Sequence, residues 1–184
     1  MKRTIDIVIT VIGLPIALFL IFVCIVLVKL SSRGPAIFRQ TRVGMHEELF
    51  TCYKLRTMYV GTHNAPSHET TASAVTPVGR WLRRLKLDEL PQLWNILRGD
   101  MSFVGPRPCL PSQVELVEAR RARGLYAIRP GITGIAQVAG IDMSDPQRLA
   151  KVDAEYLNTM SLRTDLRLIL ATAVGAGQGD RVAS

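Results

Sequence analysis

The first thirty residues differ sharply from the rest of the chain in their pattern of polar and apolar positions. Residues 7–28 include no charged side chain, and a helix of that length is about 33 Å long, close to the thickness of a bilayer's hydrocarbon core. The pattern therefore predicts a membrane helix over residues 1–30. Its length alone suits a helix that spans the bilayer.

Two features favour instead a re-entrant hairpin, in which the helix breaks and returns to the same side of the membrane. Gly13 and Pro15 lie in the first part of the segment, and a proline inside a helix removes a backbone hydrogen bond and kinks it. Lys2 and Lys29 stand at the two ends, so the positive-inside rule places both ends in the cytoplasm. The residues alone leave both topologies open, whereas the length of the apolar run disfavours a cleaved signal peptide.

The remainder of the chain has the pattern of a small α+β domain that is mainly helical. Two runs rich in aromatic and β-branched residues, 36–43 and 49–58, flank a turn at 44–47 and predict a β-hairpin. Residues 61–73 are expected to form a polar loop and residues 175–184 a flexible tail. Apolar spacing and prolines predict helices over five further stretches: 77–87, 90–97, 112–123, 145–160 and 162–174.

The predicted helix over residues 77–87 has two interpretations. It mixes four basic side chains with Trp81 and several leucines, which suits either an amphipathic helix at a membrane surface or a core-packed helix with a basic outer face. Asp88 follows this helix and could cap the next one, with Pro91 in the first turn of that second helix.

The charge balance narrows the choice of partners. Lys and Arg total 23 against 15 Asp and Glu, which gives a net charge of +8 and a pI near 9.9 and predicts attraction to lipid headgroups, nucleic acid or phosphorylated substrates. The hydrophobic content of 48% is high for a soluble protein this basic, which favours a membrane. Nucleic acid is not expected, because aromatic residues make up only 6% and no recognition motif is present.

The cysteines and histidines do not form a recognisable metal or disulfide pattern. The three cysteines are odd in number, far apart and without C-x-x-C spacing, which fits a reducing, cytoplasmic setting. His63, His68 and Glu69 could ligate a metal, but no recognised spacing joins them. A metal site in that loop is therefore not expected.

The adjacent carboxylates Asp88 and Glu89 are the most suggestive candidates for chemistry. Neighbouring cations favour their ionised form, which preserves a nucleophile or a magnesium ligand, although charged pairs at helix starts are also common as caps. Arg107 is held between two prolines, and a pre-set guanidinium is a good phosphate clamp. Lys54 and Arg56 would share one face of a strand, which either meets an anionic ligand or is simply solvated.

Several long motifs together resemble the bacterial sugar transferases called monotopic phosphoglycosyl transferases. The match extends from Lys2 to about Leu170 and keeps the family's order. The motifs are Lys54-Leu55-Arg56-Thr57-Met58, Leu87-Asp88-Glu89-Leu90-Pro91-Gln92, Gly99-Asp100-Met101-Ser102-Phe103-Val104-Gly105-Pro106-Arg107-Pro108 and Arg129-Pro130-Gly131-Ile132-Thr133-Gly134.

The resemblance implies a ping-pong reaction on a UDP-sugar. Asp88 would attack the donor, release UMP and carry the phosphosugar covalently until undecaprenyl phosphate, a polyprenyl phosphate, accepts it. Glu89 matches the second member of the family's Asp-Glu dyad, with Mg²⁺ bound at the dyad through Asp88, and Arg107 matches an arginine that binds phosphate. Further basic residues in or beside the motifs are candidates for the substrate phosphates: Lys54, Arg56, Arg83 and Arg129.

The resemblance also implies a location and an architecture. The family has a re-entrant helix broken at a proline, often as Ser-Pro, whereas this chain has Leu14-Pro15, so the kink would rest on Gly13 and Pro15. A catalytic domain over residues 31–174 is then expected on the cytoplasmic face of the bacterial inner membrane, in contact with membrane lipids. The chain resembles a minimal catalytic form of the family, and whether it forms a homo-oligomer is left open.

Two alternatives compete with this enzyme. One is a non-catalytic, membrane-tethered module that binds anionic lipid and would have no need of Asp88. The other is an enzyme in which Asp88 acts only through magnesium and the lipid phosphate attacks the donor directly. The sugar itself is open, although residues 141–146 resemble those of members that act on N-acetylated deoxyamino sugars.

Overall fold

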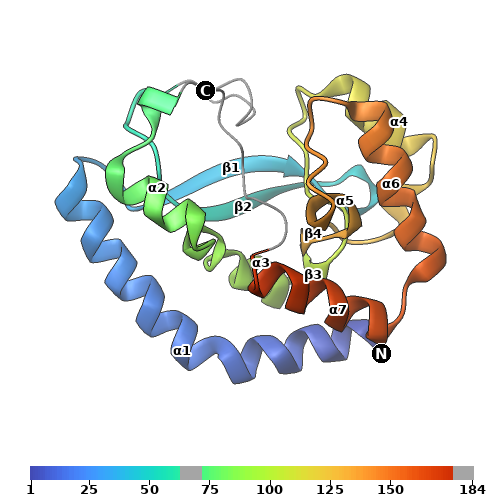
Figure 1. The fold of residues 1–184 in the computed structure, drawn as a ribbon, viewed down its shortest axis with the longest axis horizontal. Coiled ribbons are helices and arrows are strands. Elements are labelled where there is room, and N and C mark those ends of the chain that lie inside the picture. The colour runs from blue at the N-terminus through green and yellow to red at the C-terminus, as the bar shows by residue number, and fades with distance from the viewer. Residues whose placement is uncertain (63–71, 176–184) are drawn as a thin grey trace.

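The computed structural model describes residues 1–62 and 72–175 as a long N-terminal helix packed against a small, mainly helical α+β domain (Figure 1). The α+β, mainly helical domain and the long apolar helix before it agree with the predicted fold class. His63, His68 and Glu69 lie outside the described residues, and so does all but the first residue of the predicted tail.

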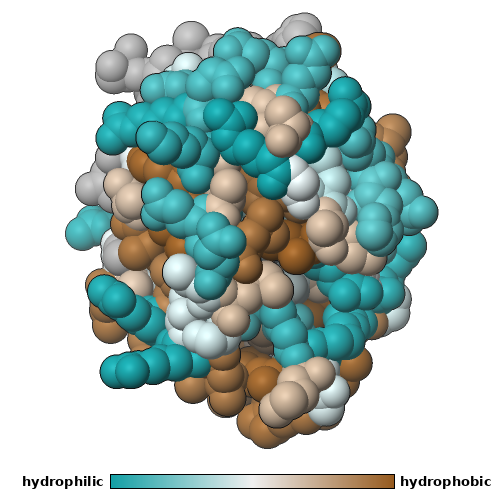
Figure 2. Space-filling view, turned by 90° about the vertical axis from the view of Figure 1, so that its right-hand side faces the viewer, coloured by the Kyte–Doolittle hydropathy of each residue, from teal (hydrophilic) through white to brown (hydrophobic). Residues whose placement is uncertain are grey.

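Helix α1 (Lys2–Ser31) is continuous through Gly13 and Pro15, so the expected break is a bend within one helix. It bows around the domain, with the N-terminus beside α7 (Leu162–Ala173) (Figure 1). Within the described part of the chain it is the one helix long and apolar enough to cross a membrane. Figure 2 shows hydrophobic surface along the lower edge of the molecule, where α1 lies in Figure 1, and mostly hydrophilic surface above it.

The predicted β-hairpin is confirmed. Strand β1 (Ile37–Val43) pairs antiparallel with β2 (Leu49–Leu55). The short 3₁₀ helix η1 (Met45–Glu47) forms the turn between them, with His46 at φ 56°. Strand β2 ends before Arg56, so Lys54 and Arg56 do not continue one strand face as expected.

The two helices predicted around the carboxylates are also confirmed, with a 3₁₀ turn between them. Helix α2 (Pro77–Arg84) begins where the Thr76 side chain accepts a hydrogen bond from the backbone N–H of Gly79. The turn η4 (Leu87–Glu89) follows, and then α3 (Gln92–Arg98), which ends at Gly99 with φ 97°. The predicted capping of α3 by Asp88 is wrong, because Asp88 belongs to η4 and the N-cap of α3 is Pro91.

A two-stranded parallel sheet lies in the turn-rich motifs, where no strand was predicted. Strand β3 (Ser102–Val104) pairs with β4 (Gly131–Thr133). The remaining elements follow the predicted helices closely or are single turns: η3 (Ala72–Ala74), α4 (Val114–Arg121), η5 (Leu125–Ala127), α5 (Ile135–Val138), α6 (Pro146–Thr159) and α7.

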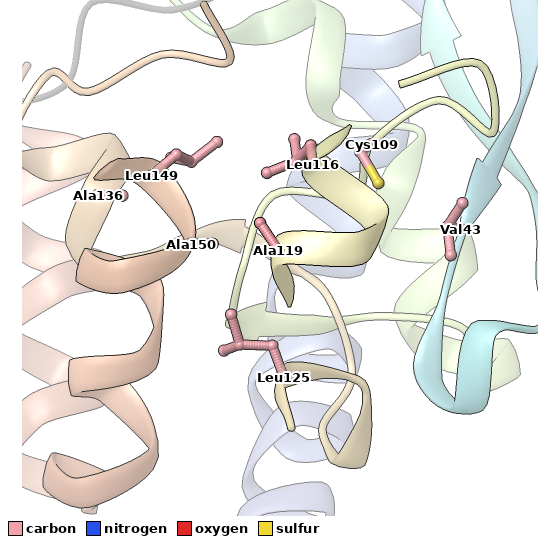
Figure 3. Close-up of a cluster of buried hydrophobic side chains, with 8 residues drawn as sticks. All are labelled: Val43, Cys109, Leu116, Ala119, Leu125, Ala136, Leu149 and Ala150. Atoms are coloured by element: carbon pink, nitrogen blue, oxygen red, sulfur yellow. The ribbon is translucent and has the colours of Figure 1, made fainter. Parts of the chain in front are cut away.

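The largest core cluster joins α4, α5 and α6 to the end of the hairpin. Figure 3 shows α4 lying between α6 and Val43 of β1, with Leu116 and Ala119 between these neighbours. A second cluster packs Cys24 and Val28 of α1 against Leu55 and Leu82, which fixes the second half of α1 to the domain. All three cysteines lie within the described residues and are free, as their spacing predicted, and the structure shows that they are also buried.

Candidate active site

The two carboxylates lie in the η4 turn, which contacts β2 and, through Glu89, the loop that follows β3. Lys86 adopts left-handed backbone geometry, with φ 56°, which ends α2 and turns the chain into η4. Asp88 retains 5% of its accessible surface and Glu89 retains 9%. Both carboxylates are therefore largely shielded from solvent.

Glu89 is held by two cations that come from distant parts of the chain. Nη2 of Arg107 lies 2.6 Å from Oε1 of Glu89, and Nζ of Lys54 lies 3.4 Å from the same oxygen. The three side chains are between 11% and 18% exposed. Charge pairs shielded in this way interact more strongly than pairs on an open surface. The structure thus brings together four of the predicted site residues, since Asp88 is the neighbour of Glu89 in the turn.

The position of Arg107 depends on close contact between the two turn-rich motifs. The backbone N–H of Gly105 donates to the carbonyl of Thr133, and the N–H of Gly131 donates to the carbonyl of Pro106, both at 2.9 Å. A Cβ atom on Gly105 would lie 2.3 Å from the carbonyl oxygen of Arg129. Glycine is therefore required at this position for the two segments to approach each other.

Arg83 lies on α2, and its Nε donates to the hydroxyl of Thr57 at 2.9 Å. A Cβ atom on Gly79 would lie 2.0 Å from the Thr57 carbonyl oxygen, so this glycine lets α2 pack directly on the chain that leaves β2. The contact anchors Arg83 beside the motif that carries Lys54.

The structure places Arg56 and Arg129 at backbone carbonyls rather than at the carboxylate pair. Arg56 is buried and donates to the carbonyl oxygens of Ser32 and Arg33, just past the end of α1. Arg129 donates through Nε to the carbonyl of Gly99, at 2.7 Å, where α3 ends. Basic side chains commonly satisfy the last carbonyls of helices in this way.

Two arginines that sequence reasoning missed lie behind Arg107. Nη1 of Arg120 donates to the carbonyl of Arg107 at 2.7 Å, and Nη1 of Arg42 donates to the carbonyl of Pro108 at 2.9 Å. Both are buried. The only signal in the sequence for the burial of Arg120 is its position four residues after Leu116, on the same helix face. For Arg42 the only signal is its place within a predicted β-strand.

The pKa of Lys86 is shifted by its burial and by the charges of Glu89 and Arg107. Burial lowers the pKa of Lys86 below its ordinary value, Glu89 opposes that shift, and Arg107 adds to it. The lysine is thus close enough to the carboxylate and guanidinium to sense both charges.

The carboxylate pair could supply only part of the coordination shell of a divalent cation. No cluster of three or more His, Cys, Asp and Glu side chains suited to a metal occurs in residues 1–62 and 72–175. Mg²⁺, however, is commonly bound through one or two carboxylates and completes its shell with water and substrate phosphates. The oxygens of Asp88 and Glu89 suit that second arrangement.

Comparison with known proteins is consistent with this geometry. Residues 1–178 match the family model described as bacterial sugar transferase. The chain is 42% identical over 183 residues to the UDP-glucose:undecaprenyl-phosphate glucose-1-phosphate transferase of Caulobacter vibrioides, covering 93% of this chain and 67% of the relative.

Two further relatives are longer than this chain. The undecaprenyl-phosphate glucose phosphotransferase of Komagataeibacter xylinus is 39% identical over 160 residues, which cover 79% of this chain and 30% of the relative. The UDP-N-acetylgalactosamine-undecaprenyl-phosphate N-acetylgalactosaminephosphotransferase of Aeromonas hydrophila is 37% identical over 178 residues, which cover 93% and 42%. The chain thus spans 30% to 67% of the three relatives. Because the family model covers nearly the whole sequence, the chain belongs to the bacterial sugar transferase family.

Proposed function

We propose that this protein transfers a sugar 1-phosphate from a UDP-sugar to undecaprenyl phosphate, releases UMP, and so begins the assembly of a polysaccharide on a lipid carrier. The observation that carries the proposal is the buried Asp88-Glu89 turn, with Arg107 and Lys54 both on Glu89. The names of the relatives support the reaction class. They differ in sugar, so the donor is specified here only as a UDP-sugar.

In the first step a carboxylate oxygen of Asp88 attacks the phosphorus that bears the sugar. The new bond joins that oxygen to phosphorus, the bond from phosphorus to the bridging oxygen breaks, and UMP leaves with the electron pair. In the second step a phosphate oxygen of undecaprenyl phosphate attacks the same phosphorus. The bond to Asp88 breaks, which frees the carboxylate and gives undecaprenyl diphosphate sugar.

The surrounding side chains supply the charge that this chemistry needs. Phosphoryl transfer is catalysed mainly by positioning and by fixed cations around the phosphate oxygens, and Arg107 and Lys54 are fixed through Glu89. The small exposed fraction of Asp88, 5%, would keep most water away from the acyl phosphate intermediate. A Mg²⁺ ion held by Asp88 and Glu89 would offset charge on the diphosphate.

A re-entrant placement of α1 in the cytoplasmic leaflet is supported by contacts at both of its ends. Near the N-terminus, Nζ of Lys2 lies 2.6 Å from Asp165 of α7, and Nη2 of Arg3 donates to the carbonyl of Leu97 at 2.9 Å. At the other end, Nη2 of Arg56 donates to the carbonyl of Ser32 at 2.8 Å. A helix that crossed the bilayer would separate its two ends by the full membrane thickness, whereas here both ends contact one domain.

Amphipathic helices at the interface are supported by exposed apolar side chains next to α1. Trp81 on α2 and Trp94 on α3 are 50% and 57% exposed, and Leu170 on α7 is 63% exposed. Tryptophan favours the membrane–water interface. Residues 31–174 would then form the catalytic domain on the cytoplasmic face, at the level where a water-soluble donor and a lipid acceptor meet.

The substitution Asp88→Asn tests the assignment. It should abolish UMP release from UDP-glucose and UDP-N-acetylgalactosamine with undecaprenyl phosphate as acceptor, while binding to liposomes persists. Glu155→Gln, which alters an exposed carboxylate on α6, should leave turnover unchanged. Full turnover by the Asp88→Asn variant would refute the enzyme described here and favour the anionic-lipid module or another reaction.

The covalent step has a separate test. Incubation of the wild-type protein with the UDP-sugar and no lipid should leave a phosphosugar adduct on the peptide that contains Asp88, detected by mass spectrometry. An active enzyme that never shows this adduct would favour direct attack by the lipid phosphate.

A further inference from the structure

The backbone around Arg107 is held at four successive carbonyl groups. The carbonyl of Pro106 accepts from the N–H of Gly131 at 2.9 Å, and the carbonyl of Cys109 accepts from the N–H of Val43 at 3.0 Å. Between them, the carbonyls of Arg107 and Pro108 accept from arginine side chains. The carbonyl of Arg107 itself thus depends on a side chain, Arg120, that does not belong to either turn-rich motif.

Arg120 is itself fixed by a buried partner on another helix. Its Nη2 lies 2.6 Å from Oδ2 of Asp153, and each side chain is 3% exposed. Arg120 belongs to α4 and Asp153 to α6, the two helices that carry much of the core drawn in Figure 3. Burial raises the pKa of the Asp153 carboxyl, and Arg120 opposes that rise.

A buried ion pair is a costly way to stabilise a core, because desolvation offsets much of the attraction between the two charges. Its distinguishing property here is geometric. The planar guanidinium of Arg120 places one terminal nitrogen on Asp153 and the other on the Arg107 carbonyl. An ammonium group has no such fixed fork, so a lysine at this position could not reproduce both bonds with one orientation.

We infer that Arg120, oriented by Asp153, is a positioning residue for the proposed reaction and acts through the backbone of Arg107. Its two terminal nitrogens are bonded to the Arg107 carbonyl and to Asp153, and not to Asp88 or Glu89. It fixes the peptide group from which the Arg107 side chain extends to Glu89, 2.6 Å away. A displacement of about 1 Å in a catalytic group can cost about 100-fold in rate, so loosening this peptide group should reduce turnover even though no reacting atom is removed. The inference rests on the proposed function.

The test is a double-mutant cycle on UMP release, with Arg120→Lys and Arg107→Ala as the two changes. In the wild-type background, Arg120→Lys should lower kcat by about 10- to 100-fold. In the Arg107→Ala background, the same substitution should change kcat by no more than about two-fold, because its effect passes through a side chain that is already gone. Equal losses in both backgrounds would show that Arg120 is only structural and would overturn the inference.

A matched control separates positioning from general stability. Leu149→Ala removes a buried side chain from the same core and should lower the unfolding temperature, yet its effect on kcat should be small in both backgrounds. If Arg120→Lys does not give folded protein, the same cycle is run with Asp153→Asn, which keeps the side-chain shape but removes the charge that orients Arg120. Asp153→Asn should lower kcat in the wild-type background and change it little in the Arg107→Ala background. An equal fall in kcat in both backgrounds would again overturn the inference.

The cycle also distinguishes its own failure from that of the proposed function. Wild-type protein that releases no UMP from any UDP-sugar would contradict the proposed reaction. Active wild-type protein whose cycle shows no coupling would contradict only the role of Arg120.

Discussion

Nη2 of Arg107 lies 2.6 Å from Oε1 of Glu89, although one residue follows β3 and the other belongs to a turn between α2 and α3. The contact joins two residues that are separated in the sequence by the helix α3 and the strand β3. Lys54 reaches the same oxygen from β2. Three segments therefore converge on one carboxylate, and each should be needed for the proposed transfer.

Replacing Arg107 by lysine should lower the kcat/KM for UMP release by about 100-fold. The lysine keeps the charge but loses the planar fork, which can hold Glu89 and a phosphate oxygen with separate nitrogens. Steady-state kinetics with saturating undecaprenyl phosphate would measure the change. Arg121→Lys, at an exposed arginine that pairs with Glu47, serves as the control, and equal activity of the two variants would contradict a phosphate-binding role for Arg107.

Gly105→Ala should reduce both thermal stability and activity. The new Cβ atom would lie 2.3 Å from the carbonyl oxygen of Arg129, so the two motifs would have to separate and Arg107 would move with them. Thermal unfolding and UMP release would be measured on the same preparation. Gly13→Ala is the matched control, since its Cβ atom meets nothing within 4 Å. A Gly105→Ala variant with wild-type stability would show that the two loops adapt without cost.

A reporter fused ahead of Met1 should remain in the cytoplasm. Both ends of α1 contact the same domain through Lys2, Arg3 and Arg56, so both should lie on one side of the membrane. Alkaline phosphatase, which is active in the periplasm, should be inactive at this position, and a fluorescent protein should be bright. Phosphatase activity would instead indicate a spanning helix.

The contribution of Lys86 to the stability of the protein should rise with pH in the range where this lysine titrates. Burial lowers the pKa of Lys86 from its ordinary value of 10.5. Between the lowered pKa and 10.5, Lys86 is protonated more fully in the unfolded chain than in the folded protein, so this residue contributes an increase in the free energy of unfolding as the pH rises. Lys86→Met should flatten this increase when unfolding is compared at about pH 8 and about pH 10. The exposed Lys151→Met should not, and identical slopes for both variants would contradict the assignment.

Much of the fold followed from local patterns in the sequence. Two runs rich in aromatic and β-branched residues predicted the hairpin of β1 and β2, and apolar spacing and prolines predicted α6 and α7, whose first turns the structure caps with Asp145 and Ser161. The capping of α3 by Asp88 was wrong for a local reason, because the left-handed Lys86 inserts a separate 3₁₀ turn before the helix. The left-handed conformation is rare for lysine, and no pattern in the sequence predicted it.

Long-range contacts account for what could not be predicted. Strands β3 and β4 have three residues each, so neither is long enough to show the alternation of apolar and polar residues that is typical of a strand. Their parallel pairing also spans an intervening helix. The convergence of Lys54, Glu89 and Arg107 followed from the family resemblance, whereas the partners of Arg56 and Arg129 depend on where helices end in space. The pair of Arg120 and Asp153 joins positions 33 residues apart, and each looks on its own like an ordinary charge on a helix.

The four successive carbonyls from Pro106 to Cys109 all accept hydrogen bonds. This feature suggests how relatives named for glucose and for N-acetylgalactosamine can belong to one family. A peptide segment whose four carbonyls all accept hydrogen bonds keeps a single shape, so in the proposed reaction it would present Arg107 to the diphosphate in the same way for either hexose. In the proposed reaction, the choice among hexoses is then expected to depend on other segments. Chimeras that exchange sugar preference between relatives should succeed when the crossover leaves this segment intact.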